Sequence, residues 1–224
     1  MKYSRLGRAI LFAEMMPEAS LKEKLSTWHG TEYLPSRMKC PGLVSGQNYR
    51  ADATDSLLTI LEAKDSDAFG SPEYQQIETQ HNELSDSMLS SDRRPSRYLG
   101  EEIYRNNPQM PDAEDSPLLF AVWWRVPPER EPEFGSWYEN EHVPLLTGCP
   151  DWRMVRRFRV INGRPEAWNH LAFHYLGSKG ALQSPERDAA RKTVWRNKLA
   201  TEPWFEATYS LFNRAGSRLH ASDT

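Results

Sequence analysis

The sequence predicts an α+β fold of two fused ferredoxin-like βαββαβ repeats, which together form one barrel within a single chain. Two observations predict this fold. The chain matches itself at a spacing of 109 residues, as Trp28 and Trp137 show (137 − 28 = 109). Each half also alternates between strand-like and helix-like segments in the same order. Such a repeat leaves one sheet face bare, so we expect each half to cover the bare face of the other.

The best-matching part of the repeat contains no gap. Residues 28–35 fall on residues 137–144, and Cys40-Pro41 falls on Cys149-Pro150 in the same register. Identical Trp, Glu, Pro and Cys-Pro in one register indicate an internal duplication. The predicted organisation is a first repeat at 1–105, a linker at 106–117, a second repeat at 118–214 and a tail at 215–224. Three prolines and three acids predict a stiff, extended linker, and the tail is expected to be frayed.

The elements follow from local patterns. In the first half we expect strand 8–15, helix 19–37, strand 42–50, strand 56–63, helix 71–90 and strand 98–105. In the second half we expect strand 118–126, helix 129–146, strand 152–161, strand 168–176, a helix that starts at 184–186 and a strand at 209–212. The dipeptide Asn162-Gly163 predicts a hairpin turn. Alternation predicts that Trp152, Met154 and Arg156 share one strand face, together with Phe158 and Val160.

Composition excludes several classes of protein. The 28 basic and 31 acidic residues nearly balance, with a net charge of −3, so a nucleic-acid or membrane-surface binder is not expected. Two cysteines cannot form a disulfide framework or a four-thiolate zinc site. The sequence contains no apolar run of membrane-spanning length, and its short N-terminal apolar run does not resemble a signal peptide. We therefore expect a cytoplasmic protein.

One motif resembles a known family. Residues 137–144, with the sequence WYENEHVP, are followed by Cys149-Pro150 and resemble the EthD-like branch of the dimeric α/β-barrel superfamily. The first half departs from this pattern with Tyr33 at the histidine position, and the second half has Asp151 where the family has glycine. The resemblance implies the fused barrel. Members include cofactor-free monooxygenases, decarboxylases, dehydratases, isomerases, polyketide cyclases and some haem enzymes.

The candidate catalytic residues are His142, Glu141 and Tyr33. The resemblance implies that His142 points into the cavity, and an imidazole suits acid–base catalysis near neutral pH. Glu141 lies beside it in the sequence. Tyr33 occupies the matching position of the first half and can donate a hydrogen bond to a carbonyl or enolate oxygen. The alternatives are that His142 only caps the next loop and that Tyr33 only packs in the core.

The candidate substrate-binding residues are Tyr138, His29, Trp124, Arg156, His170 and His174. His170 and His174 are four residues apart on a predicted strand and therefore share a face. With His142 they can make a three-histidine metal site, but the chain lacks a standard metal motif, so one pocket histidine and one solvated histidine are favoured. Arg156 can bind a substrate carboxylate or phenolate. An inward-facing tryptophan, 123 or 124, can stack on a planar substrate.

The function expected from these residues is a cofactor-independent lyase or isomerase. It would decarboxylate, dehydrate or cyclise a small aromatic or polyketide-like carbonyl compound, with His142 moving a proton and Tyr33, Tyr138 or Arg156 holding the oxyanion. No phosphate-binding glycine motif occurs, so no cofactor is expected. One alternative is an oxygen-dependent monooxygenase or haem-binding barrel, and another is a non-catalytic small-molecule binding protein. The expected partners are a small substrate and, as an open alternative, a second copy of the chain.

Overall fold

The computed structural model describes residues 6–79, 96–106, 112–165 and 168–221. Hydrogen bonds join its strands in the order β1-β3-β2-β8-β5-β7-β6-β4, and β4 pairs with β1, so that the sheet is a closed barrel. The predicted fold class, two fused βαββαβ repeats, is confirmed. The chain divides into two compact units. Unit 1 comprises residues 1–101, 161–166 and 213–224, and unit 2 comprises 102–160 and 167–212.

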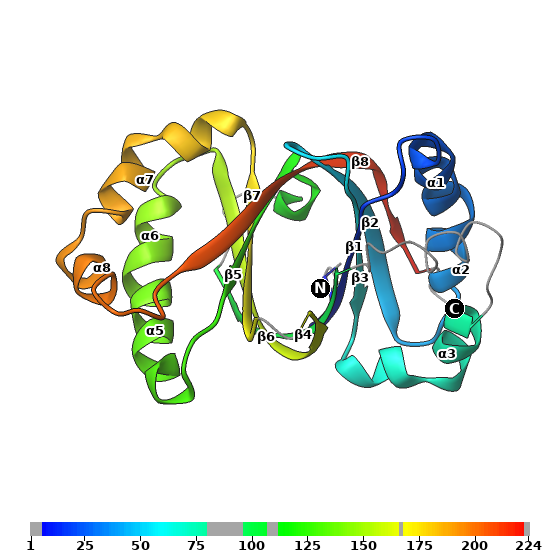
Figure 1. The fold of residues 1–224 in the computed structure, drawn as a ribbon, viewed down its shortest axis with the longest axis horizontal. Helices are drawn as coiled ribbons and strands as arrows, with labels where there is room; N and C mark the ends of the chain where they lie inside the picture. Colours follow the sequence, from blue (N-terminus) through cyan, green and yellow to red (C-terminus); the bar gives the residue numbers. More distant parts are fainter. Residues whose placement is uncertain (1–5, 80–95, 107–111, 166–167, 222–224) are drawn as a thin grey trace. The chain divides into compact units, whose positions relative to one another are not determined.

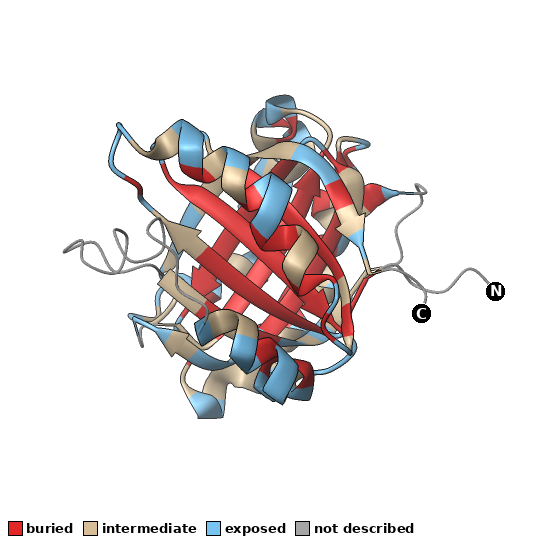
Figure 2. Ribbon diagram, turned by 90° about the vertical axis from the view of Figure 1, so that its right-hand side faces the viewer, coloured by how far each residue is buried: buried red, intermediate tan, exposed pale blue. Residues whose placement is uncertain are grey.

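Unit 1 contains a sheet with helices on one face (Figure 1). Its elements are β1 (Ala9–Met15), α1 (Lys22–Trp28), the π-helix η1 (His29–Tyr33), α2 (Leu34–Arg37), β2 (Leu43–Ala51), β3 (Leu57–Ala63), the 3₁₀ helix η2 (Ser66–Gly70), α3 (Pro72–Thr79) and the first part of β4 (Ser96–Arg105). β3 pairs antiparallel with both β1 and β2. Figure 2 shows buried strands beneath partly exposed helices.

Unit 2 repeats this arrangement, with its own helices on one face of its own sheet (Figure 1). Its elements are η3 (Ala113–Asp115), β5 (Leu118–Trp124), η4 (Pro128–Arg130), α5 (Glu131–Trp137), the π-helix η5 (Tyr138–His142), α6 (Val143–Leu146), β6 (Trp152–Arg164), β7 (His170–Leu176), η6 (Lys179–Gln183), α7 (Pro185–Ala190), α8 (Val194–Leu199) and β8 (Ala207–His220). The ends of β6 and β8 belong to unit 1. The Ser184 hydroxyl accepts from the Arg187 amide and caps α7, as its Ser-Pro-Glu sequence predicts.

The duplication extends to two irregular features. Each long helix of the repeats contains a five-residue π-helical turn, η1 in unit 1 and η5 in unit 2, and the two turns lie 109 residues apart (138 − 29). Each second strand begins with a β-bulge, between Leu43 and Ser45 in β2 and between Trp152 and Met154 in β6. Neither feature was predicted. π-helical turns are rare and often occur at functional sites.

The hairpin turn predicted at Asn162-Gly163 is wrong, because β6 continues through both residues to Arg164. Glycine is needed at position 163 instead because the backbone of β6 lies close to a side chain of another strand. A Cβ atom at this position would collide with the ring of Tyr98 on β4. Both residues lie in unit 1. The Asn-Gly pair therefore reflects packing of a strand against an aromatic ring rather than a change of chain direction.

The frayed tail predicted from residue 215 is also wrong, since β8 runs to His220. Gln47 donates hydrogen bonds to the carbonyls of Ala215 and Gly216, and buried Arg218 pairs with Glu62 at 2.9 Å. These contacts hold the segment as a strand of unit 1. The described part of the predicted linker contains a 3₁₀ turn, Ala113–Asp115, in which Ala113 is buried, so this part is not extended. Residues 107–111, 80–90 of the predicted helix, and 222–224 lie outside the described residues.

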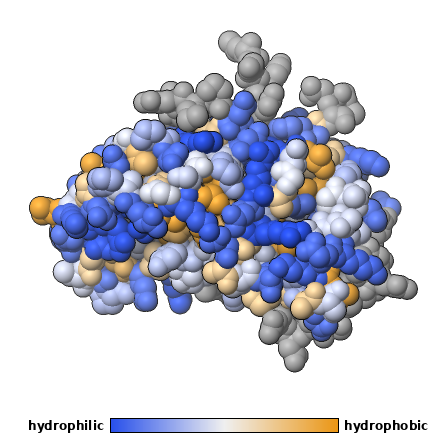
Figure 3. Space-filling view, turned by 90° about the horizontal axis from the view of Figure 1, so that it is seen from above, coloured by the Kyte–Doolittle hydropathy of each residue, from blue (hydrophilic) through white to orange (hydrophobic). Residues whose placement is uncertain are grey.

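No helix in the described part of the chain is long and apolar enough to cross a membrane. The face drawn in Figure 3 is mostly hydrophilic, and its hydrophobic residues lie in small separate groups. Such isolated groups are ordinary on protein surfaces.

Candidate functional site

The candidate site lies in unit 2, between its helices and its sheet. His170, Ala172 and His174 alternate along β7, and Ala172 belongs to the apolar core that the helices cover. The prediction that the two histidines share a face is confirmed by their contacts: His170 packs against Phe134 of α5, and His174 bonds to Tyr138 of η5. Both histidines are buried, with 4% and 1% of their surfaces exposed, so the expectation that one of them is solvated is wrong.

His174 sits between two aromatic hydrogen-bond partners. The Trp152 indole Nε1 donates to Nδ1 of His174 at 2.9 Å, and Nε2 of His174 lies 2.8 Å from the Tyr138 hydroxyl. An indole only donates, so Nδ1 must be the acceptor and Nε2 must carry the ring proton. His174 therefore donates to the Tyr138 oxygen and leaves the phenolic hydrogen available for another acceptor. Burial holds the pKa of His174 well below its usual value, which keeps the ring neutral.

The β-bulge in β6 brings Trp152 into this site. Trp152 pairs with Leu176, whereas Met154 pairs with the adjacent Tyr175, so one extra residue separates them on β6. The bulge reverses the side-chain alternation, and Trp152 joins the core beneath the helices. The prediction that Trp152 shares a face with Met154 and Arg156 is therefore wrong. The first half has a β-bulge at the equivalent position of β2, between Leu43 and Ser45.

The last residue of the π-helical turn η5 is His142, the main catalytic candidate. Its ring stacks on Trp137, with centroids 4.7 Å apart, and meets the Tyr138 ring edge-on at 5.2 Å. The Ala190 backbone lies beside the ring, and Nδ1 is buried without a hydrogen-bond partner. With the ring proton on Nε2, Nδ1 has the lone pair. Burial lowers the His142 pKa to about 4, so the imidazole is a neutral base at pH 7.

Tyr138 is positioned by a residue that the sequence did not single out for the site. The Arg157 guanidinium lies 4.8 Å from the centre of the Tyr138 ring and 2.5 Å from a carboxylate oxygen of Glu139. Burial raises the pKa of Tyr138, so the phenol keeps its proton at neutral pH. Arg157 is buried and covers one side of the ring, although its strand carries a run of arginines that resembles a solvated face. The nearby cation favours negative charge on or near Tyr138.

Aromatic side chains surround the two polar rings. Trp124 packs against Phe134 at 5.2 Å and Phe205 at 4.9 Å, and Phe205 also contacts Trp137. The predicted role of Trp124 as a wall of the site is compatible with this position. The indole nitrogens of Trp124 and Trp137 are buried without hydrogen-bond partners. Buried polar atoms without partners are uncommon in folded proteins.

His170 lies at a different part of the same core. It packs edge-on against Phe134 at 5.6 Å, and its Nε2 lies 3.5 Å from the Glu131 carboxylate. Neither ring nitrogen makes a hydrogen bond. Burial, followed by the charge of Arg157, lowers its pKa to about 4. Across the described ranges, no group of three or more His, Cys, Asp or Glu residues is placed to hold a metal ion, and the three-histidine arrangement considered above does not form one.

Two of the predicted site residues, Arg156 and Glu141, bond to residues other than His142 and Tyr138. Arg156 is fully buried on the sheet face opposite to the helices, where it bonds Glu102 at 2.7 Å and approaches the Tyr175 hydroxyl at 3.4 Å. Arg156 is therefore paired within unit 2 on the face away from the helices, and its role in substrate binding stays a prediction. The Glu141 carboxylate accepts from Thr193 at 2.6 Å, and Thr193 also caps α8. Glu141 thus fixes a helix end.

Tyr33 and His29 lie in unit 1, at the two ends of η1. Their rings stack at 4.7 Å with an angle of 11° between planes. The Arg37 guanidinium covers the Tyr33 ring at 3.5 Å and pairs with Glu78. Burial raises the pKa of Tyr33. Tyr33 therefore has neighbours of its own in unit 1.

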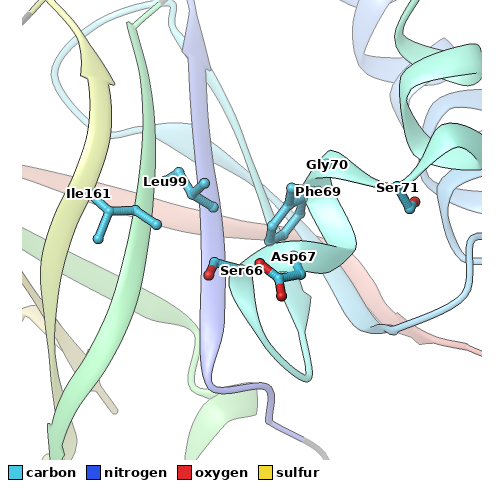
Figure 4. Close-up of a pocket in the computed structure, with 7 residues that line it drawn as sticks. All are labelled: Ser66, Asp67, Phe69, Gly70, Ser71, Leu99 and Ile161. Atoms are coloured by element: carbon cyan, nitrogen blue, oxygen red, sulfur yellow. The ribbon is translucent and has the colours of Figure 1, made fainter.

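Unit 1 also contains a broad surface hollow (Figure 4). It is lined by Ser66, Asp67, Phe69, Gly70, Ser71, Leu99 and Ile161. In Figure 4 the side chains of Leu99 and Ile161 come from strands, whereas the remaining residues come from η2 and from Ser71, which lies between η2 and α3. Asp67 is the one titratable residue in this lining.

No protein-family model and no curated protein matches this sequence. Solved structures do match the fold. An anthrone oxidase-like protein aligns over 96% of this chain and 93% of its own, with a TM-score of 0.70 and 11% identity. A candidate monooxygenase from Fusobacterium nucleatum aligns over 94% of each chain, with a TM-score of 0.60 and 11% identity. A candidate chlorite dismutase aligns over 93% of this chain and 94% of its own, with a TM-score of 0.56 and 11% identity.

These similarities establish the dimeric α/β-barrel fold for this chain. At such identities they establish no reaction, because one fold supports many chemistries. The chemistry must be argued from the side chains of the site itself.

Proposed function

We propose that this protein is an enzyme that removes a proton from a carbon activated by a carbonyl group, in a small aromatic substrate bound in unit 2. His142 is the base and Tyr138 is the hydrogen-bond donor to the developing oxyanion. The observation that carries the proposal is the pairing of a neutral imidazole, which has a lone pair on unpartnered Nδ1, with a phenol whose oxygen already accepts from His174.

The proposed step accounts for every proton and electron pair. The C–H proton moves to Nδ1 of His142, and the electrons of the broken bond shift onto the carbonyl oxygen. The Tyr138 O–H donates to that oxygen, and the guanidinium of Arg157 beside the ring stabilises the negative charge. Returning the proton to another carbon is an isomerisation, whereas expulsion of a β-hydroxyl group, which takes up a proton and leaves as water, is a dehydration. No cofactor is needed for these outcomes.

The walls of the site support an aromatic substrate. Trp124, Phe134, Trp137 and Phe205 provide flat apolar surfaces around the two polar groups. Offset or edge-to-face contacts with such rings favour a planar ligand. Because Nδ1 of His142 is buried, substrate entry requires surrounding side chains to move, and the fluorescence of Trp137 should change on binding. The Glu-His-x-Pro segment at 141–144 further supports placement in the EthD-like branch.

The test uses anthrone as the probe, under nitrogen in deuterated buffer at pH 7. Deprotonation of its methylene group places charge on the carbonyl oxygen across the ring, so hydrogen–deuterium exchange measured by NMR reports the first step alone. We expect the protein to accelerate exchange. His142→Gln should reduce the rate by roughly 100-fold or more, the usual contribution of a general base. Tyr138→Phe should reduce it by roughly 10- to 100-fold through loss of the oxyanion donor.

Tyr175→Phe is the matched control, because Tyr175 is a buried tyrosine on β7 whose hydroxyl approaches Arg156 on the other sheet face. It should leave exchange unchanged. Circular dichroism and urea unfolding verify that each variant is folded. Normal exchange in a folded His142→Gln protein would contradict the proposal, as would equal losses in Tyr138→Phe and Tyr175→Phe.

A second candidate function is oxygen-dependent oxidation of the same carbanion. The similarity in fold to an anthrone oxidase-like protein favours it. With anthrone the reaction balances as anthrone plus O₂ giving anthraquinone plus water. An oxygen electrode separates the two functions: enzyme-dependent oxygen uptake that is lost in His142→Gln supports oxidation. Proton exchange with no oxygen uptake above the uncatalysed rate supports a lyase or isomerase.

A further inference from the structure

The surface hollow of unit 1 has the size of a small-molecule site. It measures about 520 Å³, many times the roughly 30 Å³ of one water and within the roughly 300–1,000 Å³ of ligand sites in proteins. All of its lining residues belong to unit 1. Figure 4 shows strand side chains on one side of the hollow and residues of η2 on the other. The space between them therefore admits a small organic molecule.

Three of the lining side chains are large and apolar. Phe69 comes from η2, Leu99 from β4 and Ile161 from β6. Ile161 has 46% of its surface exposed, and Leu99 is partly buried. Because apolar surface in contact with water is unfavourable, this side of the hollow favours a ligand whose own apolar part covers it.

The lining is open at Gly70. A Cβ atom at this position would meet no other atom within 4 Å, and the backbone of Gly70 does not lie in the left-handed region. A side chain at position 70 therefore fits without strain and extends into free space. This glycine offers a way to fill the hollow without disturbing the fold.

The polar side of the hollow accepts hydrogen bonds and is negatively charged. The Asp67 carboxylate is exposed and has no hydrogen-bond or ion-pair partner among the described residues. The Ser66 hydroxyl donates its hydrogen to Glu101 at 2.7 Å, so its oxygen is left to accept from a ligand. Glu101 thereby adds a second carboxylate next to the lining. The described lining contains no Lys or Arg to balance these charges.

We propose that this hollow is a binding site for a small primary amine with an apolar body, bound as its ammonium ion. The ammonium group donates to the Asp67 carboxylate and to the Ser66 oxygen. The apolar body covers Leu99 and Ile161. An ammonium has three donors and no acceptor, which matches a polar side that accepts. The site lies in unit 1 and does not rest on the function proposed for unit 2.

The charges of the hollow decide between this ligand and others of the same size. A carboxylate or phosphate ligand would meet Asp67 and Glu101 as like charges. A neutral alcohol would cover the same apolar surface but would form no ion pair with Asp67. Binding of the amine should also weaken as salt is added, because Asp67 is exposed and its charge is screened.

The test is a titration of the ¹⁵N-labelled full chain with phenethylamine at pH 7, followed through the backbone amide signals of Gly70 and Ser71. We expect these signals to shift saturably. Phenethyl alcohol has the same ring and chain without the charge. It should bind roughly three- to tenfold more weakly, a factor between those of an exposed ion pair and a charge-assisted hydrogen bond. The anion hydrocinnamate should cause no saturable shift.

Three variants locate the bound amine. Asp67→Asn keeps the shape of the hollow and should weaken phenethylamine binding by roughly three- to tenfold, while binding of phenethyl alcohol stays unchanged. Gly70→Leu fills the hollow and should abolish the saturable shift of the Ser71 signal with either compound. Glu18→Gln changes an exposed acid of unit 1 outside the lining and should bind like the wild type.

Circular dichroism verifies that each variant is folded. The proposal is overturned if phenethylamine causes no saturable shift, if phenethyl alcohol or hydrocinnamate binds as tightly as the amine, or if folded Asp67→Asn binds the amine like the wild type. His142→Gln should leave amine binding intact, so failure of this site is distinguishable from failure of the proton transfer proposed for unit 2.

Discussion

Protonation of His170 should destabilise this protein in mild acid. Its folded pKa of about 4 lies below the usual value of 6.5, because the ring is buried. Between pH 6.5 and pH 4 the His170 side chain is therefore protonated in the unfolded chain but not in the folded chain. The free energy of unfolding falls as the pH falls through this range. A shift from 6.5 to about 4 corresponds to about 2 kcal/mol of lost stability between pH 7 and pH 5 for this one side chain.

The perturbation is His170→Gln, which removes the titrating group at a site without ring hydrogen bonds. Urea unfolding followed by tryptophan fluorescence at pH 8, 7, 6 and 5 gives the free energy of unfolding of both proteins. The two curves should run parallel between pH 8 and pH 7, where neither state is substantially protonated. Below pH 7 the variant should lose about 2 kcal/mol less than the wild type by pH 5. Parallel curves across the whole range would refute the argument that His170 is buried as a neutral ring.

Two further predictions concern packing and hydrogen bonding. Trp152→Phe removes the donor to Nδ1 of buried His174 and should lower the free energy of unfolding by about 1–3 kcal/mol in urea denaturation, with the pH 7 proton-exchange activity reduced as well; unchanged stability would contradict the hydrogen-bond assignment. Gly163→Ala places a methyl group against the Tyr98 ring and should cost about 1–3 kcal/mol, a loss that Tyr98→Leu in the same chain should partly reverse in the same assay.

Much of the fold was predictable because it depends on local patterns and on the repeat. The register that matches Trp28 to Trp137 fixes equivalent elements, and the structure places β1, β2 and β3 within about one residue of the predicted strands. Alternation along β7 placed His170 and His174 on one face, as their contacts confirm. Such patterns survive folding because a strand has a fixed two-residue period.

The site was predictable only in part. The sequence singled out His142, Tyr138 and His174, but alternation placed Trp152 on the wrong strand face, and Arg157 was not singled out. Trp152 reaches His174 through a β-bulge, and one inserted residue reverses every inference from alternation. Arg157 resembled part of a solvated run, yet its guanidinium is buried against Tyr138, where Glu139 balances its charge. A sequence pattern carries no information about such partners from other elements.

The sequence by itself thus determined the duplication, the order of strands and helices, and the residue types available for acid–base chemistry. The tertiary structure decided which of these residues meet. It gave His142 an unpartnered Nδ1, fixed the tautomer of His174, and assigned Arg156 to Glu102 on the opposite face of the sheet. The physical reason is that pKa values, tautomers and hydrogen-bond partners depend on burial and on atoms brought together from distant parts of the chain, whereas secondary structure depends mainly on neighbouring residues.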